Sequence, residues 1–174
     1  MKVTPNKNAK PGADFETRAA RLKELIADYN SVGLTGIHAR NASDGSIRLY
    51  ESLKEKGDLT CRVYLYRGIS AGAPLEKTQA QLAKLAEHPL HEYNNLLWLR
   101  GVKMFLDGGM LTGSAYMLEP WGVSSIYGIT DPDYRGICYA EPDKVYEIAK
   151  AALENGLQMT AHAVGNGAVE TLVN

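Results

Sequence analysis

Apolar residues recur along this chain with two different spacings, which predict alternating helices and strands. Apolar positions three or four residues apart predict helices over about 14–30, 44–57, 74–88 and 142–155. Short apolar runs rich in β-branched and aromatic residues predict strands over 33–40, 61–68, 99–109 and 157–164. Strands that alternate with helices of this length predict βαβ units and a parallel sheet.

Capping residues support the predicted helix boundaries. Asp14 can cap the first helix, and Asp44 or Ser46 opens the second. Pro74 and Pro142 suit the first turns of the next two helices, because proline there gives up no needed N–H. After the last strand, Asn166 could cap a further helix, which runs to the end of the sequence.

Side-chain alternation within the strands favours a barrel over an open sheet. Strands buried on both faces read as nearly continuous apolar runs, whereas each strand here has one apolar face and one that carries polar groups. In the strand over 99–109, one face holds Val102, Met104 and Leu106, and the other holds Lys103, Phe105 and Asp107. A complete barrel needs eight strands and about 250 residues. We therefore predict an α/β fold, a partial (β/α)8 TIM-type barrel of about four βα units with parallel strands.

The predicted organisation is a polar leader over residues 1–13 and one barrel domain over 14–174. Within that domain, residues 108–141 form a connection longer than the ~12 to 15 residues usual for an unstructured loop. Its many large apolar side chains argue for order rather than a solvated linker. Over the C-terminal face of the barrel it would form a lid or a substrate wall, or pack against the barrel mouth or a neighbouring subunit.

Composition sets limits on partners and location. Apolar residues make up 45% and charged residues 22% of the chain, with a formal net charge of −1, so nothing favours nucleic acid. No apolar run reaches the ~20 residues of a membrane span, and no signal-peptide core follows the basic N-terminus. Cys61 and Cys138 fit neither a disulfide framework nor a paired-cysteine metal motif. We expect a cytoplasmic protein with a small-molecule substrate and no membrane partner.

Lys103 is a candidate for chemistry because its strand neighbours are apolar. A buried ammonium must find a partner or lose its charge. It could reach solvent or pair with Asp107, which would be a structural role. It could instead be a base, a Schiff-base lysine or a modified metal ligand.

His162 is the second candidate, since it ends a strand and lies at the C-terminal rim where barrel enzymes keep their sites. Neutral imidazole is a common ligand of zinc-like metals, although a lone histidine is more often a hydrogen-bonded structural residue. His38 also lies toward the end of its strand. His88 and His91 fall in a connector and are expected at the surface. The sequence contains no phosphate-binding glycine loop, no nucleophile elbow and no paired-histidine motif.

Two stretches carry a family resemblance: GVKMFLDGGMLTGSAYMLEPW from Gly101 and GLQMTAHAVGNGAV from Gly156. Together they resemble the third amidohydrolase family of the amidohydrolase superfamily. The stretches GLTGIHAR and YESLKEKGDLTCRVYL are also similar to the second and third barrel strands of that family. The resemblance covers most of residues 14–174 and implies a metal-dependent hydrolase of amide-like C–N bonds, related to N-substituted formamide deformylases.

The resemblance also implies roles for individual residues. Lys103 matches an N-carboxylated lysine that bridges metals, and His162 matches another metal ligand. The implied cofactor is one or two divalent ions, with zinc expected, which activate a bridging water and polarise the scissile carbonyl. We expect Asp107, Trp121 and His38 to contribute to substrate binding.

Several ligands of the family have no counterpart in these 174 residues: its first-strand His-x-His pair, its sixth-strand histidine and its terminal-strand aspartate. Asn166 stands where the family usually has aspartate, and Ala39 replaces a frequent aspartate. We therefore expect a fragment of a hydrolase that is inactive alone. The alternative is a non-catalytic half-barrel module that self-associates, because a half barrel has sheet edges that must be covered.

Overall fold

The computed structural model describes residues 12–173, and the predicted leader lies almost wholly outside them. Four strands form one sheet in which every neighbouring pair is parallel. The strands follow one another in sequence order: β1 (Gly36–Ala42), β2 (Arg62–Gly68), β3 (Leu97–Phe105) and β4 (Gln158–His162). The predicted α/β fold with four parallel strands is confirmed.

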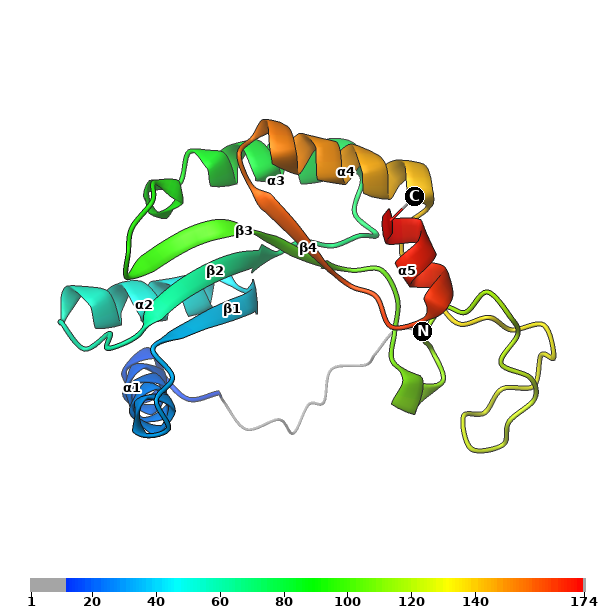
Figure 1. The fold of residues 1–174 in the computed structure, drawn as a ribbon, viewed down its shortest axis with the longest axis horizontal. Coiled ribbons are helices and arrows are strands. Elements are labelled where there is room, and N and C mark those ends of the chain that lie inside the picture. Colours follow the sequence, from blue (N-terminus) through cyan, green and yellow to red (C-terminus); the bar gives the residue numbers. More distant parts are fainter. Residues whose placement is uncertain (1–11, 174) are drawn as a thin grey trace.

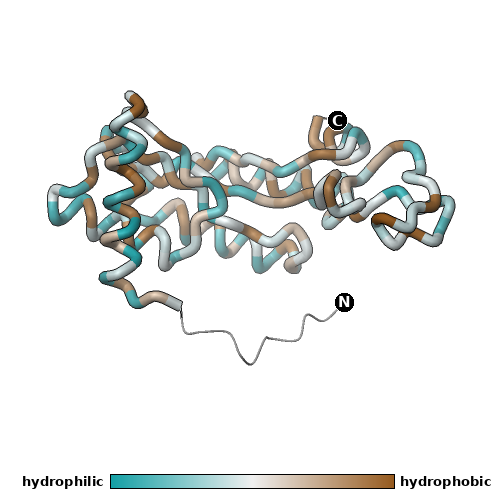
Figure 2. The backbone as a smooth tube through the Cα atoms, turned by 90° about the horizontal axis from the view of Figure 1, so that it is seen from below, coloured by the Kyte–Doolittle hydropathy of each residue, from teal (hydrophilic) through white to brown (hydrophobic). Residues whose placement is uncertain are grey.

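Helices connect the strands and follow one side of the curved sheet (Figure 1). The α-helices are α1 (Phe15–Ser31), α2 (Asp44–Glu55), α3 (Leu75–Ala86), α4 (Pro142–Glu154) and α5 (Asn166–Val173), and the short 3₁₀ turns are η1 (Pro89–His91) and η2 (Met110–Thr112). Hydrophobic and hydrophilic segments alternate along them in Figure 2, as expected of helices that bury one face. Sequential parallel strands with helices on one side form part of a barrel wall.

The core lies between the sheet and these helices. The strand residues that face the helices are fully buried: Val63, Leu65, Leu97, Leu99, Val102 and Met104. Ile148 and Leu82 meet them from α4 and α3, and are equally buried. Each such side chain contributes about 1.5–3 kcal/mol through burial.

A β-bulge in β3 changes which side chains face the helices. Leu65 pairs with Leu99, but the next residue, Tyr66, pairs with Gly101, so Arg100 is an extra residue in the ladder. Without the bulge, Lys103 would point to the same side as Leu99, because side chains two residues apart share a face. The bulge turns Lys103 to the inner face, opposite the helices.

Local capping agrees with the sequence in some places and differs in others. The Asp14 carboxylate accepts the backbone N–H of Thr17 at 2.8 Å, so its predicted role as N-cap is confirmed. The α2 helix begins at Asp44, as predicted, and its N-cap is the preceding residue Ser43, whose hydroxyl accepts the backbone N–H of Ser46.

Residues 108–141 extend beyond the C-terminal ends of β3 and β4 (Figure 1). The Trp121 indole donates to the carbonyl of Ala115 at 2.8 Å, and its ring makes an edge contact with Tyr127. An isolated antiparallel bridge joins Ser124 to Ile129. The loop therefore has internal packing of its own. Within residues 12–173, no helix is long and apolar enough to cross a membrane.

Candidate active site

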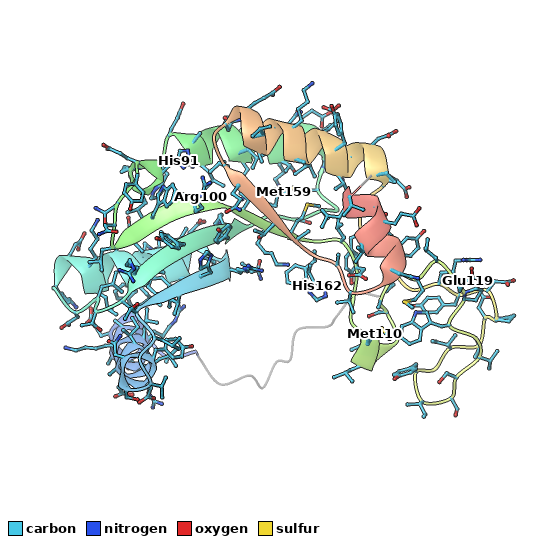
Figure 3. The ribbon with its side chains drawn as sticks, viewed as in Figure 1. His91, Arg100, Met110, Glu119, Met159 and His162 are labelled. Carbon is cyan, nitrogen blue, oxygen red and sulfur yellow. The ribbon has the colours of Figure 1, made fainter. Side chains whose placement is uncertain are left out.

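Polar and aromatic side chains gather on the inner face of the sheet, away from the helices. In Figure 3, His162 points to the open side of the sheet, whereas Met159 points toward α4. The inner-face residues that matter below are His38, Tyr64, Tyr66, Trp98, Lys103, Phe105 and His162. The sequence-predicted alternation of β3 and β4 therefore places Lys103 and His162 on one face.

Lys103 is buried, with 7% of its surface exposed. Its Nζ donates to the carbonyl of Met104 at 2.9 Å and lies 4.1 Å from the centre of the Phe105 ring. Among the described residues it forms no ion pair with a carboxylate, so the pairing with Asp107 considered from the sequence is not seen. Burial, with a smaller effect from the positive charge of Arg40, lowers the pKa of Lys103 below its ordinary value.

His162 is the last residue of β4 and pairs with Phe105 in the ladder. Its Nε2 lies 3.1 Å from the carbonyl oxygen of Gly108, a distance at which Nε2 donates a hydrogen bond. That contact leaves Nδ1 as the ring nitrogen with a free lone pair. About a third of the side chain is exposed, so the ring is open to a ligand.

Phe105 lies between the two candidates. Its ring centre is 5.0 Å from that of His162 and 4.1 Å from the Nζ of Lys103. No pattern in the sequence indicates this role for Phe105, because an aromatic residue in a strand is usually part of the core. Here Phe105 is 39% exposed on the inner face. Its ring provides an apolar surface between the amine of Lys103 and the imidazole of His162.

His38 lies two strands away, in an aromatic cluster. Its ring stacks on Tyr66 at 5.6 Å and meets the edge of Tyr64 at 5.0 Å. Tyr64 in turn contacts Trp98, and the Tyr66 hydroxyl donates to the side chain of Gln158 at 2.7 Å. This cluster crosses the inner face from β1 to β4. The ring contacts of His38 are with Tyr64 and Tyr66, rather than with Lys103 or His162.

Asp107 lies next to His162, with its Oδ1 4.0 Å from the imidazole Nε2, whereas Trp121 lies within the 108–141 loop. The side chain of Asp107 is fully buried just after β3, and its carboxylate accepts backbone N–H groups from Tyr116, Val164 and Gly165. Trp121 is half-buried within the 108–141 loop. The substrate-binding roles expected for these residues and for His38 stay predictions.

The connector histidines are half-buried rather than at the surface. The Nδ1 of His88 accepts the N–H of Leu90, and the Nδ1 of His91 lies 3.0 Å from the carbonyl of Leu99. Both are therefore only partly exposed, because the His88 ring accepts an N–H within η1 and the His91 ring lies against a carbonyl of β3.

The donor chemistry of the inner face partly fits a divalent metal. A buried lysine with a lowered pKa and an imidazole with a free Nδ1 are suitable donors once the lysine is carboxylated. Over residues 12–173, however, no group of three or more His, Cys, Asp or Glu side chains could hold a metal ion. Lys103 and His162 remain two candidate donors on one face of the sheet.

The fold is that of an α/β domain that forms part of a barrel wall. Its inner face carries two ionisable groups toward the C-terminal ends of the strands, Lys103 on β3 and His162 on β4. A model of the amidohydrolase family matches residues 4–174, so the chain belongs to that family.

Two solved structures share the fold: crystal structures of uncharacterized metal-dependent hydrolases from Pyrococcus furiosus and Pyrococcus horikoshii OT3. Their TM-scores are 0.72 and 0.71, with 19% and 20% sequence identity over 91% of this chain. The chain spans only 31% and 30% of their lengths. At these identities the likeness concerns the fold.

A curated relative, Protein LONG AFTER FAR-RED 3 of Arabidopsis thaliana, is 32% identical over 78 residues. The match covers 45% of this chain and 12% of the relative. The chain therefore corresponds to a minor part of each of these longer proteins.

Proposed function

We propose that these residues form part of a metal-dependent amidohydrolase that cleaves an amide-like C–N bond in a small molecule. The observation that carries the proposal is Lys103, a buried lysine without a carboxylate partner among the described residues, on the same face as His162. The proposal includes zinc as the metal and the cytoplasm as the compartment, where Cys61 and Cys138 stay free thiols.

Lys103 suits carboxylation by CO₂. Its lowered pKa raises the share of neutral amine, whose lone pair attacks the carbon of CO₂. The new N–C bond and the loss of one N–H proton to solvent give a carbamate anion. The side chain would then offer two carbamate oxygens as metal ligands, where the unmodified lysine would offer a positively charged ammonium.

His162 would supply its Nδ1, because its Nε2 donates to Gly108. A backbone carbonyl on the second nitrogen fixes the tautomer and orients the ring, as it does for most metal-binding histidines. The metal, when bound, supplies an activated water and polarises the carbonyl of the substrate. The remaining ligands would come from parts of the protein outside these 174 residues.

The test compares metal content in the full-length protein that contains these residues. Lys103→Ala and His162→Ala are each expected to lose bound zinc, measured by inductively coupled plasma mass spectrometry, and to lose hydrolysis. Lys84→Ala and His88→Ala are matched controls, since Lys84 is exposed on α3 and the His88 ring bonds to the backbone N–H of Leu90 in the connector after α3. Normal metal content in both inner-face variants would contradict the proposal. Mass spectrometry of the intact protein in bicarbonate buffer tests the carbamate separately, because carboxylation adds the mass of one CO₂ and Lys103→Ala should lack it.

The second candidate is a half-barrel module that self-associates without catalysis. The sheet favours it, since β1 and β4 each pair with one strand only among the described residues. Unpaired edges present backbone donors and acceptors to another chain. A metal-free symmetric dimer of the protein at its full encoded length would favour this candidate over the hydrolase.

A further inference from the structure

We infer that Asp107 is a positioning residue of this site, which ties the 108–141 loop to the turn after His162 and so fixes the imidazole. The inference rests on the proposed function in one respect, that His162 is a ligand. We call the hydrogen bonds from the Asp107 carboxylate to the amides of Tyr116, Val164 and Gly165 the Asp107 clamp. The clamp involves only described residues and can be tested without metal.

The carboxylate of Asp107 is shared by two segments that are far apart in sequence. Its Oδ2 accepts the N–H of Tyr116 at 3.0 Å, from the loop, and the N–H of Gly165 at 2.8 Å, from the turn after β4. Its Oδ1 accepts the N–H of Val164 at 3.0 Å. The side chain of Asp107 is fully buried, and burial of a carboxylate is unfavourable. The hydrogen bonds from these three amides offset that penalty.

The three residues that follow β3, Leu106 to Gly108, all hold the surroundings of His162. Leu106 donates its N–H to the His162 carbonyl at 2.9 Å, and the Gly108 carbonyl lies 3.1 Å from the imidazole Nε2. Asp107, between them, holds the amides of Val164 and Gly165. Residues 106–108 therefore hold His162 in three ways. They bond to its backbone carbonyl, to the turn that follows it and to its imidazole ring.

Asp107 acts on the imidazole through the backbone rather than directly. Its Oδ1 lies 4.0 Å from the Nε2 of His162, which is beyond hydrogen-bond distance. Loss of the clamp would free the Val164–Gly165 turn and, with it, the end of β4. The Gly108 carbonyl, next in sequence to Asp107, would then no longer keep its place against the ring.

The loop side of the clamp continues into α5. The Tyr116 carbonyl accepts the N–H groups of Gly167 and Ala168, at 3.1 and 3.3 Å. The Asn166 side chain accepts the N–H of Leu118 at 2.9 Å, so it binds the loop instead of capping its own helix. The start of α5 is thus satisfied by the loop that Asp107 anchors.

The experiment uses Asp107→Asn in the full-length protein, because asparagine keeps the shape and loses the charge and one acceptor oxygen. Hydrogen exchange of the Tyr116, Val164 and Gly165 amides should become about tenfold faster, as expected for a weakened charge-assisted bond. In the Co²⁺-loaded protein, the visible spectrum should shift and Co²⁺ affinity should fall about 10- to 100-fold, as for other residues that orient a ligand.

Asp131→Asn is the matched control. Asp131 lies in the same loop and also accepts a backbone N–H, that of Asp133 at 2.9 Å, but it is exposed. This variant should leave both the three amides and the Co²⁺ spectrum unchanged.

Unchanged exchange at the three amides would overturn the inference, and so would faster exchange spread equally over the whole protein. An unchanged Co²⁺ spectrum and affinity in Asp107→Asn would also overturn it, while leaving the metal proposal intact. Failure of the wild type to bind Co²⁺ would instead contradict the proposed function, and the exchange data would still decide the clamp. If Asp107→Asn does not fold, Asp107→Glu serves, since it keeps the charge but displaces the carboxylate.

Discussion

The backbone of Gly165 passes so close to the carbonyl of Tyr116 that a Cβ atom on residue 165 would overlap it. This contact lies beside the Asp107 carboxylate, which binds the N–H of both residues. A glycine is needed where the loop and the β4–α5 turn meet.

Gly165→Ala should therefore separate the loop from α5 and lower the free energy of unfolding by about 1–3 kcal/mol. Denaturant unfolding followed by circular dichroism measures it. Gly109→Ala is the control in the same loop, because its backbone φ is −115° and an added Cβ would meet only the Thr112 hydroxyl at an ordinary distance. Equal stability of the two variants would contradict the overlap.

Lys103→Met should stabilise the metal-free protein, because methionine fills a similar volume without an amine to bury. The expected gain in the free energy of unfolding is about 1–2 kcal/mol in a chelator-containing buffer. Lys84→Met, on an exposed position of α3, should change it by less than about 0.5 kcal/mol. A destabilised Lys103→Met would show that the amine is well compensated in the apo state.

Asp44 gives a prediction for the pH dependence of stability. Its hydrogen bond with Arg67, at 2.7 Å, is the main cause that lowers the pKa of Asp44 below 3.8. Because the folded pKa is the lower one, the stabilisation is present above pH 3.8 and disappears as the pH falls through the folded value. Asp44→Asn should cost at most about 1 kcal/mol at pH 7, since the carboxylate is mostly exposed.

The difference between wild type and Asp44→Asn should shrink to nothing in acid, as measured by urea unfolding from pH 7 to pH 2. Asp133→Asn is the control, because the Asp133 side chain forms no hydrogen bond with any of residues 12–173, and only its backbone N–H is bonded. A difference that persisted unchanged at the lowest pH would show that the carboxylate charge is not its source.

The 174-residue chain expressed alone should self-associate, since β1 and β4 each have one edge that pairs with no other strand within residues 12–173. Analytical ultracentrifugation should show a sedimentation coefficient that rises with concentration. A longer version that contains the adjoining coding sequence should lose this dependence if that sequence completes the sheet. A concentration-independent monomer of the short chain would rule out edge pairing.

Local signals predicted much of the fold. The Asp14 cap, the Pro142 start of α4 and the apolar run of β2 all act within a few residues, so the sequence shows them directly. Strand ends were less certain. The third strand was predicted over 99–109 but spans Leu97–Phe105, because Asp107 and its neighbours already bond to the loop and the next turn.

The features that depend on distant partners could not be predicted. The bulge at Arg100 is set by register against β2, and the local sign of it is the adjacent Gly101, since a glycine inside a strand often marks a bulge without fixing its place. The partners of Asp107 at Val164 and Gly165 lie 57 and 58 residues away. Lys103 and His162 were identified correctly as sharing a face, whereas the backbone contacts that orient them required the folded chain.

The chain contains two tryptophans, and they lie on either side of the Asp107 clamp. Trp98 is on β3, where its indole donates to the carbonyl of His91, and Trp121 is in the loop, where its indole donates to Ala115. Replacing either one by phenylalanine leaves a single tryptophan, on the sheet or on the loop, that can be excited apart from the tyrosines. The protein thus provides its own optical reporters, which can tell loosening of the loop from unfolding of the sheet.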